Sequence, residues 1–319
     1  MSRDYKSQSV LVTGGHGFLG THVVATLKEA GFERLSVPSR AAYDLREQDA
    51  VRALYEDSEP ELVVHLAGLV GGILANRDRP AEFFNDNLIM GTMMAHEAWR
   101  HNVSKYVTCI GGCSYPAAAV SPIEETTLWE GYPQPESAPY SLAKSMSVLQ
   151  SKSYRQQYGL NAVVLVPGNM YGPHDNFNAH NSHVVAAMIR RFFEAKRDGI
   201  PEVEVWGSGR PTRDFVYVGD VARAVLHGVE HYNGEDIINI SSGRPTSIRE
   251  LAELVAEMIG YSGGILWDTS KPDGQSEKIF AVERMRTVLG FEHLTDLREG
   301  LRHTVAWFQE HYGTGSVRL

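Results

Sequence analysis

The sequence predicts an α/β fold: a doubly wound parallel sheet with a smaller, interleaved C-terminal region. Two observations predict it. Short runs of β-branched residues alternate with helical patterns through the first two-thirds of the chain, as in a parallel sheet wrapped by helices. These runs are apolar throughout instead of alternating with polar residues, which is typical of strands covered by helices on both faces.

The predicted elements follow one another without an internal repeat or a low-complexity tract. The first strand candidates are residues 9–15, 33–40, 62–68, 105–112 and 161–169. Residues 171–183 are rich in Gly, Asn, His and Pro, and predict a long loop before a helix over 184–199. Strand and helix patterns return over residues 213–231 and 235–243, and small helices with one strand at 263–268 follow.

The composition excludes several classes of protein. With 43% apolar and 22% charged residues, and no apolar run near the roughly 20 residues that span a bilayer, we expect a soluble protein with no membrane partner. The first residues carry charges and no apolar block, which favours a cytoplasmic location. The net charge of -9 argues against nucleic acid as a partner but permits a local basic pocket for a phosphorylated ligand.

The two cysteines, Cys109 and Cys113, lie four residues apart in one apolar segment. This spacing fits neither a disulfide framework nor a zinc site, so we predict no metal and expect at least one thiol to have a chemical role.

A glycine-rich turn joins the first strand to the first helix. Gly14, Gly15, Gly17 and Gly20 lie directly between the two elements, and Phe18 and Leu19 begin the helix. Such a turn lets the backbone approach a pyrophosphate and directs the amides of the helix N-terminus at its charge. The fold is therefore predicted to be of the Rossmann type. Its dinucleotide-binding domain is assigned to residues 1–170 and about 215–243, and its substrate-binding domain to about 171–214 and 244–319.

The choice of cofactor is predicted from the end of the second strand, where an acidic side chain would bind an unphosphorylated ribose. This segment instead offers Ser39 and Arg40, a hydroxyl and a guanidinium suited to the additional phosphate of NADP. We therefore predict NADP. NAD stays open, because Asp44 lies nearby.

Tyr140 and Lys144 are candidate catalytic residues, because they lie four residues apart on one face of a predicted helix. An ammonium stabilises the phenolate of a neighbouring tyrosine, so Lys144 is expected to lower the pKa of Tyr140 toward a range useful for proton transfer.

The motifs TGGHGFLG, HLAG and YSLAK resemble those of extended short-chain dehydrogenases. Further stretches are similar to the GDP-L-fucose synthase family over almost the whole chain: LVGGILANRDRPAEFF, PGNMYGPHDNF, NSHVVAAMIRRF, VWGSGRPTRDFVYVGD and SKPDG. In that family a GDP-linked 4-keto-6-deoxy-mannose is epimerised at carbons 3 and 5 and then reduced at carbon 4 by NADPH. The resemblance also implies a homodimer built on the helices after Ala81 and around Tyr140.

The resemblance implies roles for matching residues. Cys113 and His183 match the acid-base pair of the epimerisation, Tyr140 the donor that protonates the carbon-4 oxygen, and Lys144 the residue that tunes Tyr140 and binds the nicotinamide ribose. Other matches to the cofactor site are Leu66, Ala67, Pro167, Asn169 and His183. Matches to the GDP-sugar site are Arg191, Trp206, Arg213 and Asp273, with Asn169 and Asn181 as weaker candidates.

Two positions depart from the family pattern. Gly111 stands where the family has a serine that hydrogen-bonds the carbon-4 oxygen, and Gly168 stands where threonine is common. Thr108 and Ser114 are the nearest hydroxyls; Ser114 could reach the substrate if the strand end twists near Gly112. Two lost hydroxyls in one pocket suggest a shifted or bulkier sugar.

Two alternatives to an epimerase and reductase remain. The first is an enzyme that retains NAD and epimerises a GDP-hexose or a longer GDP-sugar at carbon 4 with no net redox change, which Gly111 permits and Arg40 opposes. The second is a regulatory protein that senses NADP without catalysis.

Overall fold

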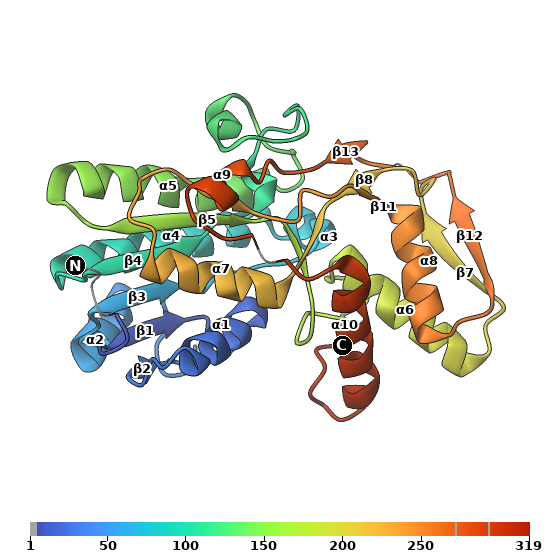
Figure 1. The fold of residues 1–319 in the computed structure, drawn as a ribbon, viewed down its shortest axis with the longest axis horizontal. Coiled ribbons are helices and arrows are strands. Elements are labelled where there is room, and N and C mark those ends of the chain that lie inside the picture. Colours follow the sequence, from blue (N-terminus) through green and yellow to red (C-terminus); the bar gives the residue numbers. More distant parts are fainter. Residues whose placement is uncertain (1–4, 272, 293) are drawn as a thin grey trace.

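The computed structural model describes residues 5–271, 273–292 and 294–319, and its centre is a six-stranded parallel sheet (Figure 1). The strands lie in the order β10-β5-β4-β3-β1-β2. Their bounds are β1 Val10–Thr13, β2 Leu35–Ser36, β3 Leu62–His65, β4 Lys105–Cys109, β5 Ala162–Pro167 and β10 Ile238–Ile240. The predicted α/β fold with a Rossmann-type sheet is confirmed. The second strand is shorter than predicted, since only two of its residues pair with β1.

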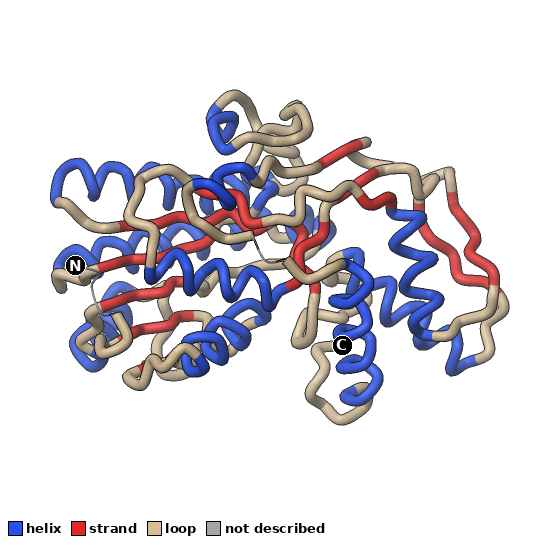
Figure 2. The backbone as a smooth tube through the Cα atoms, viewed as in Figure 1, coloured by secondary structure: helices blue, strands red, loops and turns tan. Residues whose placement is uncertain are grey.

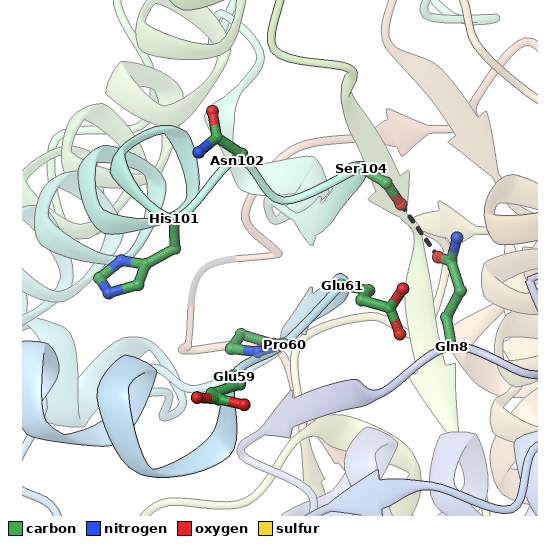
Figure 3. Close-up of a pocket in the computed structure, with 7 residues that line it drawn as sticks. All are labelled: Gln8, Glu59, Pro60, Glu61, His101, Asn102 and Ser104. Carbon is green, nitrogen blue, oxygen red and sulfur yellow. Dashed lines mark hydrogen bonds between the residues drawn. The ribbon is translucent and has the colours of Figure 1, made fainter.

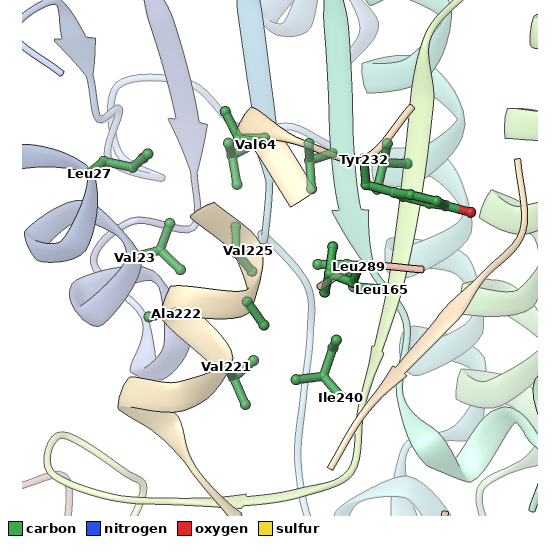
Figure 4. Close-up of a cluster of buried hydrophobic side chains, with 14 of the residues drawn as sticks. Val23, Leu27, Val64, Leu165, Val221, Ala222, Val225, Tyr232, Ile240 and Leu289 are labelled. Atoms are coloured by element: carbon green, nitrogen blue, oxygen red, sulfur yellow. The ribbon is translucent and has the colours of Figure 1, made fainter. Parts of the chain in front are cut away.

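Helices cover both faces of this sheet. Their bounds are α1 Phe18–Glu29, α2 Gln48–Ser58, α4 Pro80–Arg100, α5 Ala138–Tyr158 and α7 Val218–Glu230. Alternate residues of β1 show the two layers: Val10 and Val12 pack in the core with α1 and α7, whereas Leu11 packs in the core with α2 and α4. Figure 4 shows part of the first of these cores, with Val23 of α1, Val225 of α7 and Leu165 of β5 among its labelled side chains. Burial on both faces explains why the strands are apolar throughout.

A second group of elements lies beside the carboxyl ends of the sheet (Figures 1 and 2). Its helices are α6 Val184–Asp198, α8 Ile248–Ile259 and α10 Leu297–His311, which share a core of their own. Its strands form small sheets: β7 Glu202–Trp206 with β12 Gly264–Asp268, β8 Thr212–Arg213 with β11 Thr246–Ser247 and β13 Glu277–Lys278, and β6 Asn169–Tyr171 with β9 Phe215–Tyr217. The remaining elements are α3 Ile73–Asp78, α9 Glu283–Thr287 and the 3-10 turns η1 Gly112–Ser114 and η2 Glu125–Trp129.

The chain returns to the Rossmann-type sheet near its end. Met285, Leu289 and Phe291 are buried in the same core as β1 and α7, although they fall in the range assigned to the substrate-binding domain. The domain boundaries themselves stay a prediction. Within the described residues, no helix is both long and apolar enough to cross a membrane.

Candidate functional site

The candidate site lies where parallel strands β1, β3, β4 and β5 end, because the carboxyl ends of parallel strands meet at one edge of a sheet. A different hollow, shown in Figure 3, lies at the opposite edge, among residues that precede β1, β3 and β4. None of the predicted site residues lines that hollow.

The glycine-rich turn is held tightly against the end of β3. Gly14 has a φ of +71°, and a Cβ there would stand 2.6 Å from the backbone nitrogen of Ala67. A Cβ on Gly20 would collide with the carbonyl oxygen of Gly14, while the amide of Gly17 donates to that same oxygen at 2.9 Å. Within the described residues no side chain caps the N-terminus of α1, where Phe18 and Leu19 form the first turn. The turn therefore presents uncapped amides beside Leu66 and Ala67, as a bound pyrophosphate needs.

The loop after β2 exposes Ser39 and Arg40. Asp44, the acidic alternative, is held by Arg46, whose Nε donates to one carboxylate oxygen at 2.9 Å. This hydrogen bond lowers the pKa of Asp44 to about 2. Because the Asp44 carboxylate already has a guanidinium partner, the geometry favours the phosphate-binding role of Arg40 over a ribose-binding role of Asp44.

Tyr140 and Lys144 are both buried on α5. The Tyr140 ring packs edge-on against Phe83, with ring centroids 6.1 Å apart. Burial raises the pKa of Tyr140, and the nearby thiols of Cys113 and Cys109 raise it further. Burial also lowers the pKa of Lys144. The expectation that Lys144 lowers the pKa of Tyr140 was therefore wrong, because desolvation raises this pKa instead. Tyr140 keeps its hydroxyl proton and can donate it.

Cys113 lies in η1 and packs against the cluster of Ala75, Phe83 and Tyr140. The other thiol, Cys109, ends β4, and burial raises its pKa to about 12. Cys113 therefore packs beside Tyr140, whereas the Cys109 thiol stays protonated at neutral pH.

His183 precedes the first turn of α6, at the end of the long loop. His183 is exposed, and desolvation by neighbouring groups lowers its pKa. Its loop is tied to the site through Asn181, whose carbonyl accepts a hydrogen bond from the amide of Gly72 at 3.1 Å. Among the described residues no hydrogen bond joins His183 to Cys113.

Lys278 is a site residue that the sequence prediction missed. It pairs in register with Arg213 across β13 and β8, and its charge interacts with Cys113, Arg213 and Asp214. Burial lowers the pKa of Lys278, and the same cause lowers that of Arg213. The only feature of the sequence that pointed to Lys278 was its position four residues after the SKPDG motif. Pro272 of that motif lies outside the described residues.

Arg191 and Trp206 line one open hollow of about 390 Å³ between α6 and β7, together with acidic side chains that include Glu194 and Glu202. Arg191 donates to the carbonyl of Glu204 at 2.7 Å, and Trp206 is 56% exposed. Asp273 holds the adjoining loop, because its carboxylate accepts from the amide and the hydroxyl of Ser208 at 2.6 and 2.8 Å.

Neither hydroxyl near Gly111 points toward Tyr140. Ser114 is buried and donates to the carbonyl of Ser141 on α5 at 3.2 Å, and Thr108 donates to the carbonyl of His65 at 3.1 Å. That Ser114 reaches the substrate stays a prediction, and its hydrogen bond to helix α5 opposes it.

The missing threonine hydroxyl at Gly168, by contrast, is replaced by a hydroxyl from another residue. Gly168 lies between Pro167, which ends β5, and Asn169, which begins β6 and donates to the carbonyl of Asp214 at 2.9 Å. A Cβ on Gly168 would overlap the buried hydroxyl of Ser241, which follows β10. The Ser241 hydroxyl occupies the volume that a threonine at 168 would fill, so only the Gly111 position has lost its hydroxyl.

Comparison with known proteins places this geometry in a family. A model of the NAD dependent epimerase/dehydratase family matches residues 10–241, from β1 to the residue after β10. The chain belongs to the NAD dependent epimerase/dehydratase family. This epimerase/dehydratase family member is 39% identical over 303 residues to GDP-L-fucose synthase 1 from Arabidopsis thaliana, covering 95% of this chain and 94% of that relative.

Solved structures of the epimerase/dehydratase fold agree closely with this one. A GDP-L-fucose synthetase from Naegleria fowleri bound to NADP superposes with a TM-score of 0.91 at 28% identity, over 100% of this chain and 98% of that chain. A GDP-D-glycero-L-gluco-heptose synthase from Campylobacter jejuni in the presence of NADPH has a TM-score of 0.86 at 27% identity, over 96% and 98%.

Proposed function

We propose that this protein is an NADP-dependent GDP-sugar epimerase and reductase, which exchanges protons next to a 4-ketone and transfers hydride to carbon 4. The observation that carries the proposal is the meeting of Tyr140 and Cys113 beside Gly111, next to a dinucleotide-binding turn. The likeness to GDP-L-fucose synthases supports the same chemistry, and the likeness to a GDP-heptose synthase supports GDP-sugars with a longer carbon chain.

The cofactor site fits NADP, because Gly14 and Gly20 allow the tight turn that leaves the amides at the start of α1 uncapped, and Ser39 and Arg40 are exposed after β2. Bound NADPH supplies the hydride. The backbone from Gly14 to Gly20 would bind the pyrophosphate, and Ser39 and Arg40 would bind the ribose phosphate. The residues assigned to the remainder of the dinucleotide are Leu66, Ala67, Lys144, Pro167, Asn169 and His183.

The 4-ketone acidifies the hydrogens on both neighbouring carbons. Epimerisation removes such a proton from one face of the carbon and adds a proton to the opposite face, so it needs a base and an acid. Cys113 and His183 take these roles. Since burial lowers the pKa of His183, its imidazole is neutral at neutral pH and can accept a proton. The charge of Lys278 interacts with Cys113, which lies on the same side of the candidate site as Arg213 and Asp214.

Reduction needs a proton donor for the carbon-4 oxygen. Tyr140 has this role, since burial keeps its hydroxyl protonated. Lys144, four residues later on α5, positions Tyr140 and binds the nicotinamide ribose. A buried donor beside the developing oxyanion stabilises it more strongly than water does.

The GDP group fits the second group of elements. Arg213 and Lys278 stand side by side on neighbouring strands, an arrangement that suits the diphosphate. Arg191 and Trp206 bind the guanine. The N–H groups of the guanine can donate hydrogen bonds to the acidic side chains of the same hollow. Asp273 supports the loop that carries Trp206.

The test is to follow NADPH absorbance while the protein meets GDP-4-keto-6-deoxy-mannose, with products resolved by NMR. Loss of NADPH together with a 4-reduced, 3,5-epimerised sugar is expected. Sugar isomers without NADPH loss would instead identify the NAD-retaining epimerase, and binding without chemistry would identify a sensor.

We also propose a cytoplasmic homodimer. Helices α4 and α5 pack against each other and expose Phe84 (41%) and Leu149 (54%), which a second copy would cover. The free thiols Cys109 and Cys113 suit a reducing compartment. Sedimentation at micromolar concentration tests the dimer, and Leu149→Glu is expected to yield monomers.

A further inference from the structure

The glycines around the candidate site differ in the structural constraint that requires a residue without a side chain. Gly14 needs its positive φ, and a Cβ on Gly20 would collide with the backbone of Gly14. A Cβ on Gly112 would overlap the ring of Phe280, and one on Gly168 would overlap Ser241. Backbone conformation or packing therefore fixes these four positions.

Gly111 has neither constraint. Its φ of -91° and ψ of 148° suit any residue. A Cβ there would meet side-chain atoms alone: Cys113 Sγ at 3.1 Å, Tyr140 Cε1 at 3.4 Å and the Tyr140 hydroxyl at 3.5 Å. A small side chain would fit after the Cys113 thiol shifts by a few tenths of an ångström. Glycine at 111 therefore leaves a notch between the Tyr140 hydroxyl and the Cys113 thiol, which the fold does not require.

A polar group best fills this notch. Its walls include one hydroxyl and one thiol, and the hydroxyls of Thr108 and Ser114 donate to backbone carbonyls elsewhere. An apolar ligand group would leave the Tyr140 hydroxyl without a second partner, which is costly in a buried site. In the proposed function, the bound ligand supplies the group that fills the notch.

The position of the notch identifies which part of a sugar enters it. In the proposed function, on which this inference rests, the carbon-4 oxygen lies at the Tyr140 hydroxyl. Only carbon 5 separates carbon 6 from carbon 4, so a hydroxyl on carbon 6 lies close to the carbon-4 oxygen. Both oxygens can therefore reach the Tyr140 hydroxyl. The methyl group of a 6-deoxy sugar offers no hydrogen bond there.

We propose that Gly111 is a specificity-determining residue, which selects a GDP-sugar that keeps an oxygen on carbon 6 over its 6-deoxy counterpart. The notch accepts the carbon-6 hydroxyl of a hexose or of a longer sugar, and this hydroxyl takes the place of a side-chain hydroxyl beside Tyr140.

Two stable sugars that differ only at carbon 6 test this directly: GDP-L-galactose carries the hydroxyl and GDP-L-fucose lacks it. Their dissociation constants are measured by calorimetry on NADPH-loaded protein, which cannot reduce either sugar further. The wild type is expected to bind GDP-L-galactose about three- to tenfold more tightly, the size of one neutral hydrogen bond. Gly111→Ser is expected to lose or reverse this preference, and Gly111→Ala to weaken GDP-L-galactose binding without strengthening GDP-L-fucose binding.

Gly91→Ser is the matched control, because a Cβ at Gly91 on α4 also meets a flexible side-chain atom at 3.1 Å, the hydroxyl of Ser147. It should keep the wild-type preference, and thermal unfolding checks that each variant is folded. Equal binding of the two sugars by the wild type, or a preference that Gly111→Ser leaves unchanged, would overturn the inference. If neither sugar binds better than GDP alone, the proposed function fails as well.

Discussion

At the scale of single residues, the site depends on groups whose surroundings set their protonation. Tyr140 is buried beside two thiols, and each of these surroundings raises its pKa. His183 lies at the end of a loop, and its lowered pKa keeps it neutral. A protonated donor and a neutral acceptor thus coexist at neutral pH, as proton exchange followed by reduction requires.

The Tyr140→Phe substitution should separate the two reactions. We expect NADPH oxidation to fall by about 10²- to 10⁴-fold, the usual contribution of a general acid, while deuterium from solvent still enters the sugar next to the ketone. Rates of absorbance change and NMR of the recovered sugar measure the two effects. Tyr154→Phe, on the same helix but hydrogen-bonded to His96, is the control and should keep both rates. Equal loss of both reactions would assign Tyr140 a different role.

The two cysteines should respond differently. Cys113→Ser is expected to abolish deuterium entry into the sugar, because a serine hydroxyl is a much weaker acid than a thiol. Cys109→Ser should leave deuterium entry nearly unchanged, since Cys109 is a packing residue at the end of β4. Mass spectrometry of the sugar after incubation in deuterated water distinguishes them, and the reverse pattern would exchange their roles.

Gly168 and Ser241 should behave as a coupled pair. Gly168→Thr alone is expected to lower the melting temperature, because its Cβ overlaps the Ser241 hydroxyl in a fully buried position. Adding Ser241→Gly should restore the melting temperature, and this rescue is read from a double-mutant cycle. Additive losses in the double variant would show that the two side chains do not compete for one volume.

At the scale of elements, the segment from β13 to Phe280 brings the second group of elements onto the sheet. The Phe280 ring fits against Gly112 and Gly168, which follow β4 and β5. Its amide donates to the buried carboxylate of Asp214 at 3.1 Å. Lys278, two residues earlier, is thereby held near Cys113.

The loop after β2 should determine the cofactor. Arg40→Ala is expected to weaken NADPH binding about 10- to 100-fold, the value of a charge-assisted hydrogen bond to phosphate, and to leave NADH binding unchanged. Fluorescence titration of both nucleotides measures this. Arg34→Ala, an exposed arginine just before β2, should change neither affinity. Equal weakening of NADPH and NADH would contradict a phosphate contact.

The sequence predicted those parts of the site that are close together in the chain. The glycine turn and the Tyr140–Lys144 pair are local patterns, and the structure places both at the carboxyl edge of the sheet. Lys278 and Ser241 could not be predicted in the same way, because distant strand pairing brings them to Arg213 and Gly168. The hydrogen bond of Ser114 could not be predicted for a similar reason, since its partner Ser141 is on another element.

At the scale of the whole molecule, buried carboxyl groups make stability depend on pH. Asp175 lies in the long loop where Phe177 pairs with Arg318 near the C-terminus. Burial raises its pKa to about 7, and burial raises that of Asp214 to about 6. Both carboxyl groups hold a proton in the folded chain that the unfolded chain releases above its ordinary pKa, so their contribution to stability is full below about pH 4 and is lost as the pH rises to about 7.

Asp175→Asn should therefore flatten this dependence. The melting temperature of the wild type is expected to fall by several degrees between pH 5 and pH 8, and that of the variant to fall less. Calorimetry across this range measures both, with Asp78→Asn, an exposed carboxylate, as the control. A variant that loses stability as steeply as the wild type would show that Asp175 does not titrate in this window.

The late place of Lys278 and Phe280 in the chain also affects biosynthesis. Chains fold from the N-terminus as they are made, and the six-stranded sheet is complete once β10 has been synthesised. The nucleotide-binding turn can thus form on the ribosome before Lys278 and Phe280 have been synthesised. At that stage Cys113 lacks the Lys278 ammonium, and Gly112 is not yet covered by the Phe280 ring. A nascent chain of this kind could take up its dinucleotide, but it would gain a working reaction centre only when its last segments are released.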